Sequence, residues 1–170
     1  MATKMYKCQR GLKLPATIQT NHVWVEVNNH SSSELKELLY TFAKCFTKEF
    51  DFGSAYCYPF DNHSSYQAFL FIQEGKLIGG CAFHALKLGE ECSMPKLEWV
   101  WLIRSQRRQG HFQKLWDSFT SDLEKLAIGC PIEESMQAFI KKQTNWQVVY
   151  QGDLADESGY VFLERTRERS

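Results

Sequence analysis

The chain has 170 residues, a length that suits one domain with a full hydrophobic core. Its 20 lysines and arginines balance its 20 aspartates and glutamates, so no global field draws it to nucleic acid or to an acidic membrane. Apolar residues make up 44% and aromatic residues 14% of the chain, which excludes disorder over most of its length.

The cellular setting follows from segments that the sequence lacks. No apolar run reaches the ~18 residues that span a bilayer, and no apolar stretch follows the N-terminal lysines. We therefore expect a cytoplasmic protein with no nucleic-acid or membrane partner. The six cysteines show no C-x-x-C spacing and are expected to be free thiols. No metal site is expected, because Cys81 and His84 point to opposite faces of a predicted strand.

The first half of the chain predicts a strand, a helix and a hairpin. In chain order these are a strand over 23–27, a helix over about 33–50, a loop over 51–65, and hairpin strands over 67–73 and 76–86. Ser31 and Glu34 have capping-box spacing at the start of the helix. Gly79 and Gly80 indicate a bulge or close packing within the hairpin.

The second half alternates strands with helices. It predicts a polar loop over 87–95, a strand over 96–103, a basic turn over 104–110, a helix over about 110–125, a short strand over about 126–131, a helix over 131–143, and strands over 146–151 and 160–164. The strand over 96–103 has almost no surface character, so we expect it to be central and covered on both faces. This order favours a mixed α/β fold around one sheet.

The candidate site lies in residues 97–116, where a buried strand runs into a basic turn and an amphipathic helix. Helix N-terminal amides, the helix dipole and the charges of Arg104, Arg107 and Arg108 favour a phosphate or diphosphate there. Gly110 allows the backbone to approach the anion closely. Alternatively, the arginines only solvate a loop. The sequence contains no Walker-type phosphate loop and no dinucleotide-binding glycine motif.

The run Arg107-Arg-Gln-Gly110-His-Phe112 resembles the R/Q-x-x-G-x-G/A signature of the GNAT acyltransferase superfamily. The order of predicted elements over roughly 20–165 is also similar to that family. The resemblance implies a single acyltransferase-like domain over 1–170. Its expected fold is a GNAT-like mixed sheet of about six or seven strands, flanked by helices and splayed between the fourth and fifth strands.

The resemblance also implies a reaction. The expected activity is direct transfer of an acetyl group from acetyl-CoA, as co-substrate, to a primary amine of a small molecule or peptide. The expected partners are therefore acetyl-CoA and an amine acceptor, and the chain would be a monomer or a homodimer. The implied cofactor-binding residues are Leu102, Ile103, Arg104, Arg107, Arg108, Gln109, Gly110, His111 and Phe112. The amides of Gln109, Gly110, His111 and Phe112, with the side chains of Arg107 and Arg108, would hold the diphosphate. Backbone groups of Leu102 and Arg104 would pair with the pantetheine arm, and an amide near Leu102 would polarise the thioester carbonyl.

An amine acceptor must lose a proton, so the reaction needs a base. Glu98 is the first candidate, because it is a carboxylate in an otherwise apolar strand and the family often places a glutamate there. Alternatively, Glu98 forms a structural ion pair beside Lys96. His84 is the second candidate base, or else a packed, hydrogen-bonded core residue.

The sequence departs from the family pattern in three places. Phe112 stands where a second glycine or alanine is usual, and Arg104 stands where proline is common. The tyrosine that often serves as the general acid is absent from the predicted helix over 131–143. These departures leave open a GNAT-fold CoA-binding or protein-interaction module without turnover. A plain interaction domain, whose arginine turn binds an acidic partner, is a third possibility.

Acceptor choice would belong to the variable parts of the fold. These are the first helix, the 51–65 loop and the C-terminal hairpin. Aromatic side chains of that loop and its flank are candidates for lining the acceptor pocket: Tyr56, Tyr58, Phe60 and Tyr66.

Overall fold

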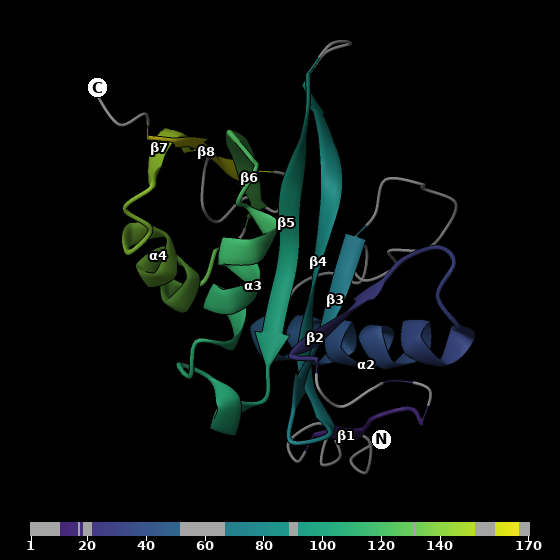
Figure 1. The fold of residues 1–170 in the computed structure, drawn as a ribbon. Helices are drawn as coiled ribbons and strands as arrows, with labels where there is room; N and C mark the ends of the chain where they lie inside the picture. The colour runs from purple at the N-terminus through teal and green to yellow at the C-terminus, as the bar shows by residue number, and fades with distance from the viewer. Residues whose placement is uncertain are drawn as a thin grey trace. The chain divides into compact units, whose positions relative to one another are not determined.

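The computed structural model describes residues 11–16, 18, 22–51, 67–88, 92–130, 132–151 and 159–166. The elements in chain order are β1 (Leu12–Lys13), β2 (Trp24–Val27), α2 (Ser33–Phe50), β3 (Gln67–Gln73), β4 (Lys76–Leu88), β5 (Cys92–Leu102), η2 (Arg104–Gln106), α3 (His111–Phe119), β6 (Lys125–Gly129), α4 (Glu134–Lys141), β7 (Trp146–Gln151) and β8 (Tyr160–Arg165). Their strands pair in the order β2-β3-β4-β5-β6-β8-β7, and β1 pairs with β4 (Figure 1). The predicted α/β mixed sheet is confirmed, with the two-residue β1 as an additional strand.

The chain divides into two compact units that share β4 and β5. The first unit comprises residues 1–83 and 99–118, and the second comprises residues 84–98 and 119–170. The predicted aromatic pocket of the 51–65 loop lies outside the described residues.

The first unit contains α2 and the antiparallel strands β2, β3 and the start of β4. Residues 68–72 of β3 are buried on both faces, and α2 buries Leu39, Phe42 and Ala43. Burial of one apolar helical face explains why periodicity alone located α2 correctly. The helix ends at Asp51, which is left-handed and donates its backbone amide to the Thr47 carbonyl.

The predicted cap of this helix is wrong by one residue. Ser32 is the N-cap, and its side chain accepts from the Leu35 amide at 3.4 Å. The Ser31 hydroxyl instead accepts from the Asn28 amide at 3.0 Å, within the turn that follows β2. Ser31 is therefore used to close the preceding turn, and its neighbour takes over the cap.

The predicted close packing at the paired glycines of β4 is confirmed. A Cβ atom added to Gly79 would lie 2.2 Å from the Trp101 carbonyl oxygen and 2.8 Å from the Leu102 Cα. The β3–β4 register also shifts between Phe71 and Ile72. Gly79 therefore lets β4 lie unusually close to the last residues of β5.

We predict that Gly79→Ala destabilises the chain by at least about 2 kcal/mol, because the new methyl group meets backbone atoms that cannot rotate away. Denaturant unfolding measured by circular dichroism checks this. A stability equal to that of the unaltered chain would show that the strands separate without cost.

The second unit contains a parallel pairing between β5 and β6, at Lys96↔Ala127 and Leu97↔Ile128. Antiparallel β8 pairs with β6 on one side and with β7 on the other. Arg165 stabilises the turn before β6, because its guanidinium donates to the carbonyls of Thr120, Ser121 and Leu123.

Three predicted boundaries are corrected. The helix predicted over about 110–125 is α3, and it ends at Phe119. Leu126 fits the apolar spacing of that helix, but it is buried in strand β6. The loop predicted over 87–95 is largely strand, because backbone pairing between β4 and β5 needs no apolar side chain. The helix predicted from 131 begins at Glu134.

Within the described ranges, no helix is both long and apolar enough to cross a membrane.

Candidate functional site

The backbone at the end of β5 has one edge on β4 and one edge directed away from it. The Ile103 amide donates to the Ile78 carbonyl at 2.9 Å and so belongs to the β4 pairing. Alternate residues of a strand direct their N–H groups to opposite edges, so the Leu102 amide points away from β4. The Leu102 carbonyl, by contrast, already accepts from the Arg107 Nε at 2.8 Å. The strand end therefore presents an amide donor to a ligand.

The turn that follows has two residues in the left-handed region, Arg108 with φ 63° and Gly110 with φ 80°. Gly110 is exposed, and a Cβ atom added there would meet nothing within 4 Å. Helix α3 begins at the next residue, and the Lys114 amide donates to the Gly110 carbonyl at 3.1 Å. The first amides of α3 thus follow an open glycine, as an anion site at a helix N-terminus requires.

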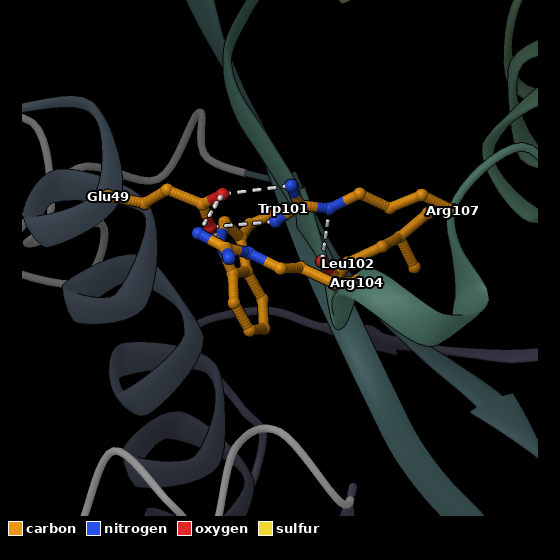
Figure 2. A network of polar contacts seen from close by, with 5 residues as sticks. All are labelled: Glu49, Trp101, Leu102, Arg104 and Arg107. Atoms are coloured by element: carbon orange, nitrogen blue, oxygen red, sulfur yellow. Dashed lines mark hydrogen bonds and ion pairs between the residues drawn. The ribbon is translucent and has the colours of Figure 1, made fainter.

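The three arginines of the turn differ in their surroundings. Arg107 is half-buried against Glu49 of α2, whereas the Arg104 side chain is 77% exposed and lies 3.5 Å from the same carboxylate (Figure 2). Within the described part of the chain, the exposed Arg108 guanidinium has no hydrogen-bond or ion-pair partner. Arg108 is therefore the arginine whose charge is available to an anion.

Glu49 is the residue of this region that sequence reasoning missed. Its carboxylate accepts from Arg107 Nη1 at 2.9 Å, from Arg107 Nη2 at 2.7 Å and from Trp101 Nε1 at 2.7 Å (Figure 2). The hydrogen bonds from Arg107 lower the pKa of Glu49 from 4.5 to about 2. Partial burial opposes this shift, and the hydrogen bond from Trp101 adds to it. No periodicity or motif relates two residues 58 positions apart, so no signal in the sequence could have identified this pair.

The pKa of Glu49 makes a pH-dependent contribution to stability. Its folded pKa lies below its unfolded value of 4.5, so the contribution is complete above pH 4.5 and is lost as the pH falls toward 2. We predict that Glu49→Gln lowers the free energy of unfolding by about 1–3 kcal/mol at pH 7 and that the difference shrinks below pH 4.5.

Denaturant unfolding between pH 7 and pH 3.5 measures this difference. Glu37→Gln, the same change at an exposed position of α2, is the matched control and should leave stability unchanged. A pH-independent difference between the Glu49 variant and the unaltered chain would contradict the assignment.

Phe112, where the family pattern has a small residue, is turned into the core. Its ring centroid lies 6.5 Å from that of Phe71 and 5.9 Å from that of Trp116, both with tilted or edge-on geometry. The Phe112 side chain is 8% exposed. Phe112, which departs from the family pattern, therefore anchors α3 on the sheet.

The polar residues of the turn bond to one another. The Gln109 side-chain amide donates to the Ser105 carbonyl at 2.8 Å. The His111 Nε2 lies 3.1 Å from the Gln106 side-chain oxygen. Burial, together with the Lys114 charge, lowers the pKa of His111 at the start of α3.

The two candidate bases lie in the second unit. Glu98 is paired with Lys96, with Nζ and Oε1 2.9 Å apart and the Glu98 side chain 9% exposed. Its other oxygen lies toward Gly129, where an added Cβ atom would approach Oε2 at 3.3 Å. The structure thus contains the ion pair that the alternative interpretation of Glu98 described. His84 is half-buried in β4.

The remaining candidate chemistry is sparse. Among the described residues, no group of three or more histidine, cysteine, aspartate or glutamate side chains gathers as metal ligands would. Cys45, Cys81 and Cys130 form no disulfide with a described residue, and burial raises the pKa of Cys81. Helix α4 offers Phe139 and Lys141 but no tyrosine.

No protein-family model matches this chain, and no curated protein matches it. Several solved structures, however, match it. An acyl-CoA N-acyltransferase from Pseudomonas aeruginosa matches with a TM-score of 0.60 and 15% identity, covering 84% of this chain and 98% of that one. An aminoglycoside 6'-N-acetyltransferase complexed with coenzyme A matches with a TM-score of 0.57 and 10% identity, covering 84% and 95%.

A further solved structure gives the same result. An acetyltransferase of the GNAT family from Staphylococcus aureus matches with a TM-score of 0.54 and 15% identity, covering 82% of this chain and 97% of that one. At these identities the likeness is one of fold, and it extends over nearly the whole of each matched structure.

Proposed function

We propose that this chain, which has the fold of the GNAT acetyltransferases, is an acetyl-CoA-dependent N-acetyltransferase acting on a primary amine of a small molecule or peptide. The observation that carries the proposal is Gly110. It is exposed, left-handed and open around its Cα, and it directly precedes the first amides of α3. A diphosphate can therefore approach the backbone without meeting a side chain.

The diphosphate would be bound mainly by backbone groups. The amides of Gln109, Gly110, His111 and Phe112 surround the start of α3, where the helix dipole favours negative charge. Arg108, which is exposed and has no ion-pair partner among the described residues, would add its guanidinium charge to them. In this proposal Arg107 and Arg104 shape the turn, since both are associated with Glu49.

The pantetheine arm would lie along the end of β5, beside Leu102, Ile103 and Arg104. The Leu102 amide, directed away from β4, would donate to the thioester oxygen as negative charge develops there. This donor is held rigidly, because the neighbouring Ile103 amide is fixed to β4 and the Leu102 carbonyl is fixed to Arg107.

The chemistry requires a neutral amine, which attacks the thioester carbonyl carbon and displaces the CoA thiolate. Glu98 would accept the amine proton, directly or through water, with His84 as the second candidate. Lys96 would then orient the Glu98 carboxylate. Since α4 contributes no tyrosine, solvent or another donor would protonate the thiolate.

The acceptor class rests on the reaction that the fold supports. One structure with this fold is named for acetylation of an aminoglycoside amino group, which supports a primary amine as acceptor here. The alternative is a CoA-binding module without turnover, favoured by the Lys96–Glu98 ion pair and by the absence of a tyrosine from α4.

Coenzyme A binding provides the first test. We predict that CoA and acetyl-CoA raise the melting temperature, since a ligand at a hundred times its Kd stabilises the native state by about 2.7 kcal/mol. Arg108→Ala should weaken binding about tenfold by removing a charge-assisted contact. Lys141→Ala, at an exposed lysine of α4, is the matched control. The absence of any shift in the unaltered chain would refute the proposal.

Turnover provides the second test, with a panel of primary amines and a thiol-release readout. We predict that Glu98→Gln keeps the melting shift with acetyl-CoA but slows thiol release by about a hundredfold or more, because the base is lost. Transfer at the parent rate would exclude Glu98 as the base. CoA binding without thiol release for any amine would favour the module without turnover.

A further inference from the structure

Glu49 links the end of α2 to the candidate diphosphate turn. We propose that Glu49 is a positioning residue for this turn (residues 104–110), acting through Arg107 rather than by touching the ligand. The proposal rests on the proposed function, because it concerns how the diphosphate-binding backbone is held. The supporting contacts all lie within the first unit.

The first argument is geometric. Both oxygens of the Glu49 carboxylate accept from the two terminal nitrogens of Arg107, at 2.9 and 2.7 Å. The Arg107 Nε donates to the Leu102 carbonyl at 2.8 Å, so one side chain joins the helix end to the strand end. A two-point ion pair fixes orientation as well as distance, which a single contact does not.

The second argument is the conformation of the backbone. Arg107 directly precedes Arg108, whose φ of 63° is unusual for a residue with a side chain, and Gly110 follows with φ 80°. Glycine adopts such a conformation freely, but a residue with a side chain, such as Arg108, keeps it only where the surroundings hold it. Arg107 is the last residue before them, and its own amide donates to the Arg104 carbonyl at 3.3 Å. Fixing Arg107 therefore fixes the point from which the left-handed segment starts.

The third argument is the partial burial of the Glu49–Arg107 ion pair. The pair lies against Trp101, which is 7% exposed. The Trp101 Nε1 donates to Glu49, and the centroid of its ring lies 5.7 Å from the Arg107 guanidinium carbon. The Trp101 ring also packs on Phe42 of α2, with centroids 5.8 Å apart. A pair held against a buried ring is less screened by solvent than an exposed surface pair.

The fourth argument is charge. Glu49 compensates Arg107 and lies 3.5 Å from Arg104, so it relieves repulsion between two cations of the turn. Figure 2 draws this network of Glu49 with Trp101, Arg104 and Arg107. Arg108 is exposed and has no anionic partner among the described residues, so Glu49 leaves a cation in the turn for a diphosphate near Gly110.

Calorimetric titration with CoA and with 3'-dephospho-CoA tests the proposal. The variants are Glu49→Gln, Arg107→Gln and the double variant, with Glu37→Gln on the same helix as the matched control. Glu49→Gln should weaken both ligands by the same factor, about tenfold, because both carry the diphosphate. The double variant should bind no more weakly than Arg107→Gln, since the effect passes through Arg107.

Folding is kept separate from positioning by working well below the melting temperature of each variant, checked by circular dichroism. Glu49→Asp is a second variant: it keeps the charge but is too short to reach both groups, and it should give an intermediate loss of affinity. Full retention of CoA affinity by Glu49→Gln, or additive losses in the double variant, would overturn the positioning role while leaving the proposed function intact. Failure of the unaltered chain to bind CoA would overturn both.

Discussion

The candidate site depends on one carboxylate. Glu49 gathers three N–H donors from Arg107 and Trp101 and ties the end of α2 to the end of β5. Charge-assisted bonds of this kind are about twice as strong as neutral ones, and a planar guanidinium fits a carboxylate at two points. Beyond Arg107, the backbone of Arg108 then adopts a left-handed conformation that its own local preference disfavours.

Close packing of the neighbouring strands and of α3 makes the surroundings of this contact rigid. Gly79 allows β4 to lie against the backbone of Trp101 and Leu102. On the other side of the turn, Phe112 packs on Phe71 and Trp116 and holds α3 against the sheet. Along the chain, the open backbone near Gly110 thus follows one tightly packed segment and precedes another, as suits a preformed anion site.

Much of the architecture could be predicted from the chain's own periodicity. The bounds of α2, β3 and β7 agree with the prediction, because apolar spacing and turn residues are local signals. The GNAT fold was predicted from the motif at Arg107–Phe112 and its place between a strand and a helix, and structural matches over most of the chain confirm it. The end of α3 was not predictable, since Leu126 fits either a helical face or a buried strand.

The sequence by itself determined that an arginine-rich turn with a glycine would precede an amphipathic helix, because these are properties of neighbouring residues. Only the tertiary structure decided which arginine pairs with a carboxylate and which has no such partner among the described residues. Arg107 meets a carboxylate 58 positions away, whereas Arg108 extends into solvent. A charge pattern gives the number of cations, but long-range packing determines where each one points.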